Sequence, residues 1–178
     1  MYKGNYANRI VNFCAMLILV QISSTCINPF APEYKEGEPL ENLLGNPTTI
    51  SGFYTRFQNA YKLRDTTLYG PLIHPEFTFT YRNPDQNVDV SWGRVEELMS
   101  TSRLFQYSRE IDLTWNNVIV ELTNGLGTEA QIIRRFDLIV SLEGSDVLRT
   151  DGSANFVLQR PDTLQPWKLI RWRDQSDL

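Results

Sequence analysis

Few side chains in this sequence could carry acid–base chemistry. His74 is the only histidine, and an imidazole ordinarily titrates near neutral pH, which suits a general base. Asp137 is the second candidate, because a carboxylate inside the apolar run 136–142 would be a base if its side faced a cavity. Both also have ordinary explanations: His74 precedes Pro75 and suits a cap or surface position, and most strand carboxylates are exposed.

Aromatic side chains make up 12% of the chain and could form a binding pocket. Tyr54, Tyr61 and Trp92 are the candidates for ligand-binding residues, with Tyr61 as a hydrogen-bond donor. Packing in the core is the favoured alternative, because helical and strand spacing explains most of these positions. Arg134 and Arg135 lie on opposite faces of a predicted strand; Arg135 is the candidate for anion contact, and ion pairing across the sheet is the alternative.

The sequence contains no nucleophile elbow, phosphate-binding loop, dinucleotide fingerprint or metal-ligand cluster. We therefore expect neither a metal nor a cofactor. Gly125 and Gly127 lack the third glycine of a nucleotide fingerprint and indicate a turn between strands. Glu96 and Glu97 fall on a predicted helix, of which one face is expected to be solvated.

The first 26 residues resemble a bacterial lipoprotein signal peptide. Lys3 and Arg9 precede the uncharged, mostly apolar run 10–22, and small residues then lead to Cys26. The apolar run is shorter than the ~20 residues that span a bilayer, which disfavours a permanent helical anchor. The resemblance implies that Cys26 is lipidated and that a membrane is a partner of the protein through this anchor.

Two features near the cysteine bear on localisation. Ile27 stands where an inner-membrane retention signal would place Asp, so a lipid-anchored position in the cell envelope is expected, with the outer membrane favoured. Ser23 and Thr25 depart from the usual lipoprotein box, and a secreted or periplasmic protein is the alternative. Cys14 is the only other cysteine and lies inside the leader, so no disulfide is expected in the mature chain.

The rest of the chain is predicted to be a tether and one domain. Residues 27–46 contain three prolines and four glutamates and read as a flexible tether, and residues 47–178 have the length of one domain. The chain carries 17 Lys and Arg against 21 Asp and Glu, and both basic leader residues would be lost with the leader. Such an acidic balance disfavours nucleic acid as a partner.

Hydrophobic spacing predicts helices first and strands later. A helix is expected from Pro47, capped by Asn46 or Thr48, with a short turn over 67–74 and a third helix over 92–104. Strands are expected at these alternating or apolar segments: 77–81, 88–90, 111–115, 118–122, 136–142, a strand beginning at 156, and 167–173. A bend or bulge is predicted at residues 116–117.

Four segments in this order resemble the nuclear transport factor 2-like superfamily, an α+β cone. They are YKLRD at 61–65, LIHPEFTF at 72–79, WGRVE at 92–96 and WKLIRWRD at 167–174. The resemblance covers residues 47–174 and implies an α+β fold, with a strongly curved antiparallel sheet wrapped on three N-terminal helices. The superfamily contains isomerases, cyclases, dehydratases and non-catalytic binding domains, so the fold leaves the function open.

Three functions remain under this resemblance. The first is a lipid-anchored envelope protein whose non-catalytic domain binds a small apolar ligand or a protein partner, and we favour it because no convergent acid–base set is visible. The second is an isomerase- or cyclase-type enzyme with a pocket carboxylate or histidine as base. The third is a structural homodimer that forms a subunit of an envelope assembly.

Overall fold

The structure, a computed structural model, describes residues 43–83, 85–142, 144 and 146–176. The predicted leader, the lipidation site Cys26 and the tether as far as residue 42 lie outside this part of the chain. No helix within the described part is long and apolar enough to cross a membrane.

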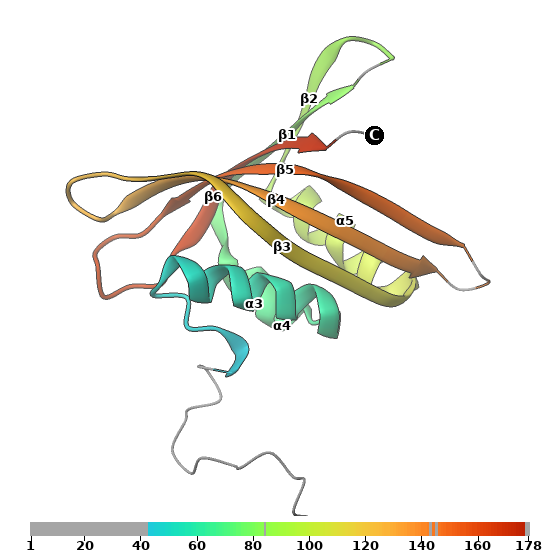
Figure 1. Cartoon of the computed structure of the whole chain (residues 1–178), viewed down its shortest axis with the longest axis horizontal. Helices are drawn as coiled ribbons and strands as arrows, with labels where there is room; N and C mark the ends of the chain where they lie inside the picture. The colour runs from blue at the N-terminus through green and yellow to red at the C-terminus, as the bar shows by residue number, and fades with distance from the viewer. Residues whose placement is uncertain (1–42, 84, 143, 145, 177–178) are drawn as a thin grey trace, which may run out of the picture. The chain divides into compact units, whose positions relative to one another are not determined.

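Helices and strands follow the order expected from the sequence (Figure 1). The elements are α3 (Ile50–Leu63), α4 (Thr66–Tyr69), the 3-10 turn η2 (Gly70–Leu72), β1 (Ile73–Asn83), β2 (Val88–Gly93), α5 (Arg94–Tyr107), β3 (Ser108–Thr123), β4 (Glu129–Leu142), β5 (Val147–Gln159) and β6 (Lys168–Ser176). The predicted fold class, a curved sheet on three helices, is confirmed.

The strands form one sheet in the order β2-β1-β6-β5-β4-β3. All neighbours pair antiparallel except β1 and β6, which run parallel. The register of β3 against β4 shifts between Trp115 and Val118, which confirms the irregularity predicted at residues 116–117. The sheet curves over helix α3, which packs along β3 (Figure 1). Helix α5 packs on β1 and β2.

The core lies between α3 and the inner face of the sheet. Phe53, Phe57 and Tyr61 repeat at every fourth position of α3, so they share one face of the helix, and all three are buried. The Phe57 ring contacts Trp115 edge-on at a centroid distance of 5.6 Å and stacks on Tyr61 at 5.0 Å. Burying each such side chain contributes about 1.5–3 kcal/mol, which fixes α3 against the sheet.

The start of α3 differs from the prediction. Thr49, not Asn46 or Thr48, is the N-cap, and its hydroxyl accepts a hydrogen bond from the Gly52 N–H at 3.0 Å. Asn46 instead forms a local turn, in which its side-chain oxygen accepts from the backbone N–H of Thr48 at 3.0 Å. The helix therefore begins at Ile50, three residues after Pro47.

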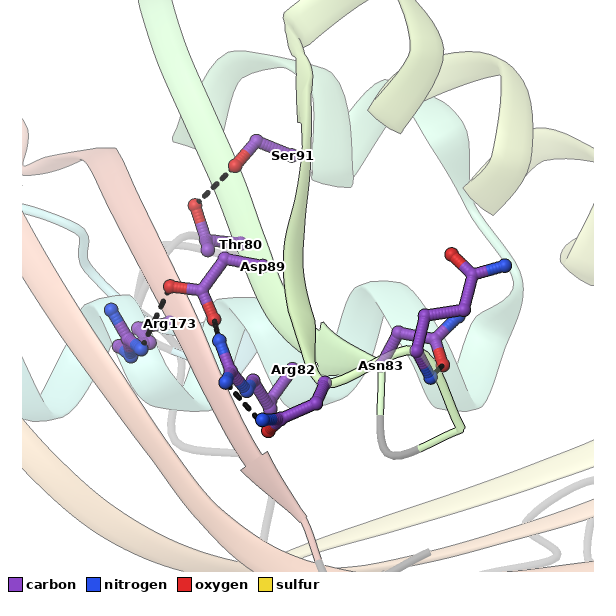
Figure 2. Close-up of polar contacts among 8 residues, drawn as sticks. Thr80, Arg82, Asn83, Asp89, Ser91 and Arg173 are labelled. Carbon is purple, nitrogen blue, oxygen red and sulfur yellow. Dashed lines mark hydrogen bonds and ion pairs between the residues drawn. The ribbon is translucent and has the colours of Figure 1, made fainter.

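A polar cluster on the outer face of the sheet fixes the β1–β2 hairpin beside β6. Asp89 on β2 pairs with Arg82 on β1 and with Arg173 on β6, each at 3.1 Å (Figure 2). The hydrogen bond from Arg82 holds the pKa of the Asp89 carboxyl below its ordinary value. Thr80 and Ser91, hydrogen-bonded at 2.9 Å, complete the hairpin (Figure 2). Strand alternation consequently turns Trp92, next to Ser91, to the inner face.

Helix α5 starts two residues later than predicted, and it buries one of its two adjacent glutamates. Trp92 belongs to β2, which ends at Gly93. Helix α5 begins at Arg94, because the Glu96 carboxylate accepts from the Gly93 N–H at 3.0 Å and caps the first turn. The apolar residues of α5 are partly outside: Val95 and Met99 are 71% and 50% exposed. Of the two adjacent glutamates, Glu96 lies on the solvated face of the helix, and Glu97 is buried and 4% exposed.

Candidate functional site

A cavity of about 280 Å³ remains between α3, α5 and the inner face of the sheet. All six strands contribute side chains to it. Apolar and aromatic side chains form most of its wall: Phe57, Tyr61, Phe79, Trp92, Leu104, Leu113, Trp115, Phe136, Leu138 and Trp172. Ser100 on α5 also lines the cavity and is exposed, so the mouth of the cavity lies beside it.

The sheet register explains why this wall has both aromatic and polar parts. Leu113, Leu138 and Thr150 form one row across β3, β4 and β5, and each lies on the inner face of its strand. Phe156 and Trp172 are paired across β5 and β6, and Trp172 also contacts Phe79 edge-on at 5.0 Å. A hydroxyl at Thr150 is thus set among rings and aliphatic side chains, where hydrogen-bond partners are scarce.

Glu97 is the most unusual side chain at the cavity. Its Oε1 accepts hydrogen bonds from the Tyr69 hydroxyl at 2.5 Å and from the Thr101 hydroxyl at 3.1 Å. Its Oε2 accepts from the Trp92 indole N–H at 2.8 Å. A buried carboxylate is stable only when it is well hydrogen-bonded, and three donors meet that condition here. Since a carboxylate has about four acceptor positions, roughly one is left for a ligand.

Tyr61 extends this network toward α3. It interacts with Thr101 and Tyr69, the two hydroxyls that bind Glu97. Burial raises the pKa of Tyr61, and the Glu97 charge raises it further. The pKa of Tyr69 is likewise raised well above its ordinary value, chiefly by burial. Both phenols are therefore neutral at physiological pH and act as hydrogen-bonding groups, not as bases.

Three buried polar atoms of lining residues have no hydrogen-bond partner within the described part of the chain. They are the indole Nε1 atoms of Trp115 and Trp172 and the hydroxyl Oγ1 of Thr150. Leaving a buried donor unpaired costs about 1–3 kcal/mol. A ligand with an acceptor oxygen would recover part of this free energy. The carboxylate of Asp174 lines the same cavity and also has a polar interaction.

The structure brings two of the predicted ligand-binding residues to this cavity. Tyr61 and Trp92 both line it, from α3 and β2. Tyr54 lies on the same helix face but borders a different hollow, at the start of α3. Arg135 is on the outer face of β4, where it forms a distant ion pair with Asp151 at 3.9 Å. Arg135 lines neither hollow, and the binding roles of Tyr54, Tyr61 and Trp92 stay predictions.

The two predicted bases lie outside the cavity. Asp137 is exposed on the outer face of β4, and its Oδ2 accepts a hydrogen bond from the Asn116 amide at 2.7 Å. His74 borders a separate groove near Arg160 and Lys168, and its Nδ1 accepts from the Glu76 N–H at 3.1 Å. A reaction in the aromatic cavity would have to use other groups than these two.

Sequence reasoning missed Glu97, although a signal was present. Glu96 alone caps α5, so capping does not account for a second glutamate at position 97. Glu97, Thr101 and Phe105 repeat at every fourth position and all three are buried, so a polar pair continues into an aromatic residue on one helix face. Such a stripe indicates a polar network inside a core.

A metal site is not indicated here. Among the described residues no group of three or more His, Cys, Asp or Glu side chains is close enough to hold a metal ion. The donors of the Glu97 network are hydroxyl and indole groups, which suit an organic ligand.

Comparisons with known proteins identify the fold. No protein-family model matches the sequence, and no curated protein matches it. A candidate scytalone dehydratase from Novosphingobium aromaticivorans is 14% identical, with a TM-score of 0.61 over 78% of this chain and 87% of that chain. LinA is 15% identical, with a TM-score of 0.58 over 78% of this chain and 90% of its own.

A nuclear transport factor 2-like superfamily protein from Salmonella enterica is 16% identical, with a TM-score of 0.53 over 72% of this chain and 87% of that chain. These similarities concern the backbone, and at such identities they establish the fold alone. The domain has the nuclear transport factor 2-like fold, as the four sequence segments implied.

Proposed function

We propose that this protein is a lipid-anchored cell-envelope protein whose domain binds a small, mostly apolar ligand in the aromatic cavity without catalysis. The observation that carries the proposal is the set of unpartnered polar atoms of Trp115, Thr150 and Trp172 around an otherwise apolar wall. A ligand with an aromatic ring and an acceptor oxygen would pack against the apolar side chains and accept hydrogen bonds from these polar atoms.

The cavity volume sets the size of the ligand. A protein cavity of about 150 Å³ holds a benzene molecule. A cavity of about 280 Å³ therefore suits a molecule with two fused rings and a short polar substituent. The carbonyl group of such a ligand would accept from the indoles, and a hydroxyl group would donate to the remaining position of Glu97.

The experiment compares two ligands of similar shape by calorimetry on the full-length protein. We expect 2-acetylnaphthalene to bind about tenfold more tightly than 2-ethylnaphthalene, because only the ketone accepts hydrogen bonds. Thr150→Val should reduce this preference. Thr114→Val, on the exposed outer face of β3, is the matched control and should leave it unchanged. Equal affinity of both naphthalenes for the unmodified protein would refute the proposed role of the polar atoms.

An isomerase- or cyclase-type enzyme is the second candidate, because Glu97 and Asp174 are carboxylates that line the cavity. Against it, three donors already occupy Glu97, which leaves little capacity to take a proton from a substrate. Deuterium exchange at the methyl group of bound 2-acetylnaphthalene tests the point. Exchange that the protein accelerates and Glu97→Gln abolishes would favour the enzyme; no acceleration favours simple binding.

The envelope location rests on the sequence of the leader. Cys26→Ser removes the only thiol that the predicted processing could lipidate, so the protein should move from the membrane fraction to the soluble fraction of cells. Cys14→Ser is the matched control and should leave the protein with the membrane. A homodimer on the outer sheet face remains an alternative, which light scattering of the purified protein decides.

A further inference from the structure

A second hollow, of about 530 Å³, lies at the N-terminal end of α3. It shares no lining residue with the aromatic cavity. Most of its lining residues are polar, and they include the hydroxyl side chains of Thr48, Thr49, Ser51 and Thr123. Three further lining residues carry charge: Arg134, Arg160 and Glu121.

A buried hydroxyl without a partner borders this hollow. Tyr54 is 2% exposed, and its ring is held by stacking on Phe156 and by an edge contact with Trp115. Its Oη is buried and has no hydrogen-bond partner in the described part of the chain. Tyr54 itself lines the hollow, together with Arg134 and Glu121, whose charges act on this hydroxyl.

The protonation state of Tyr54 makes it a donor. Burial raises the pKa of this phenol, and the smaller, opposite influence of Arg134 does not reverse the shift. The hydroxyl therefore keeps its proton at neutral pH. A buried donor that the protein leaves unpaired is a natural contact for an acceptor supplied from outside.

Arg134 is held in place with most of its donors unused. Its Nε donates to the backbone oxygen of Asn116 at 2.8 Å, and its guanidinium carbon lies 4.9 Å from the centre of the Tyr54 ring. The two terminal nitrogens have no hydrogen bond or ion pair with any residue that the structure describes. A guanidinium fixed in this way can donate hydrogen bonds from both terminal nitrogens to a carboxylate or phosphate group.

Two further features give the hollow a positive field. Helix α3 has 14 residues and no acidic residue in its first turn, so its N-terminal partial charge is uncompensated locally. Arg160 is fixed by the backbone oxygens of Thr48, Gly127 and Thr163 and lies 4.0 Å from the Trp167 ring centre. Glu121 supplies the one opposing charge among the lining residues.

We propose that this hollow is a second binding site, which takes a small oxyanion of the carboxylate or phosphate type through Arg134, the Tyr54 hydroxyl and the first turn of α3. The site is independent of the ligand in the aromatic cavity. The oxyanion accepts from the terminal nitrogens of Arg134 and from Tyr54, and the helix N-terminus stabilises its charge.

The test titrates full-length protein with sodium phosphate and, separately, sodium acetate, at an ionic strength held constant with sodium chloride. The readout is the amide resonances of Ile50, Ser51 and Gly52, the first turn of α3. We expect saturable shifts with at least one of the two anions and none with chloride. The anion with the lower dissociation constant identifies the type of head group.

Variants separate a built site from general charge attraction. Arg134→Gln should weaken anion binding at least about tenfold, since it removes a charge-assisted contact. Arg135→Gln is the matched control, because this neighbour lies on the outer face of the same strand. Tyr54→Phe should weaken binding several-fold while it keeps the ring in the core, so folding is preserved.

Two results would overturn the proposal. One is the absence of saturable shifts with both anions at tens of millimolar. The other is an equal loss of affinity in Arg134→Gln and Arg135→Gln, which would mean that only overall charge matters. Thermal unfolding of each variant identifies any that is misfolded, and Tyr54→Phe then decides the result without a change of charge.

Discussion

Replacing Glu97 should destabilise the domain far more than replacing its neighbour Glu96. Glu97→Ala removes the acceptor of three donors, which are the buried hydroxyls of Tyr69 and Thr101 and the part-buried indole N–H of Trp92. Leaving a buried donor without a partner costs about 1–3 kcal/mol, so the loss of three hydrogen bonds should cost several kcal/mol. A domain of this size has a total stability of only about 5–15 kcal/mol, so the loss should be large and easily measured.

Glu97→Gln isolates the role of the second carboxylate oxygen. The amide oxygen can still accept from Tyr69 and Thr101, but the amide nitrogen then faces the Trp92 N–H, another donor. One charge-assisted hydrogen bond is lost and one buried donor is left unpaired, which costs on the order of 2 kcal/mol. Glu96→Gln should cost less than about 1 kcal/mol, because an amide oxygen still accepts from the Gly93 N–H.

Urea unfolding followed by tryptophan fluorescence measures these differences, since Trp92 is itself bound to Glu97. The expected order of stability is unmodified protein, then Glu96→Gln, Glu97→Gln and Glu97→Ala. The reasoning would be refuted by equal free energies of unfolding for Glu96→Gln and Glu97→Gln, because Glu97 would then be as solvated as its neighbour.

Four further changes have defined outcomes. Thr150→Val should leave the unliganded protein as stable or up to about 1 kcal/mol more stable in urea unfolding, because it removes an unpartnered buried hydroxyl. Gly52→Ala should lower the free energy of unfolding by more than about 2 kcal/mol, since the new Cβ would collide with the Asn46 backbone. Gly70→Ala is the control and should cause no such loss, because its Cβ would meet open space. Asp65 caps α4, and the hydrogen bond from Thr67 lowers the pKa of its carboxyl; Asp65→Ala should therefore cost about 1 kcal/mol at pH 7. Because the pKa of Asp65 is lower in the folded than in the unfolded protein, its stabilising contribution is complete above the unfolded pKa of 3.8 and is lost as pH falls through the folded pKa. The free energies of unfolding of Asp65→Ala and of the unmodified protein should therefore become equal in acid. Burial raises the pKa of Tyr54, Tyr61 and Tyr69, so their stabilising contribution is complete below pH 10 and should fall at higher pH; ultraviolet titration should show these tyrosines ionising only together with unfolding.

Local patterns in the sequence were sufficient for most of the fold. Alternation over 77–81 and 136–142 correctly indicated parts of β1 and β4, and helical spacing correctly placed Phe53, Phe57 and Tyr61 on one buried face. These features depend on near neighbours in the chain, so a local pattern reports them. The start of α3 was predicted wrongly because its N-cap is Thr49 and not Asn46 or Thr48. Several neighbouring residues have side chains that can cap a helix, so the local sequence does not select one of them.

The candidate site was predicted less well, because burial is a property of the whole domain. Alternation showed that Asp137 is opposite to Phe136, yet only the packing of α3 on the sheet determines that Phe136 is inside. The same limit applies to α5, where Val95 and Met99 are exposed while Glu97 is buried. Spacing alone predicts which residues share a face, and it does not predict which face is covered.

The sequence by itself determined the order of the elements, the kinds of side chain available and the signal-like leader. The tertiary structure alone decided that Glu97 meets Tyr69 and Trp92, and that Trp115, Thr150 and Trp172 leave polar atoms unpaired around one cavity. The physical reason is that these groups come from different helices and strands. Their hydrogen bonds and their loss of water arise only when the curved sheet closes over the helices.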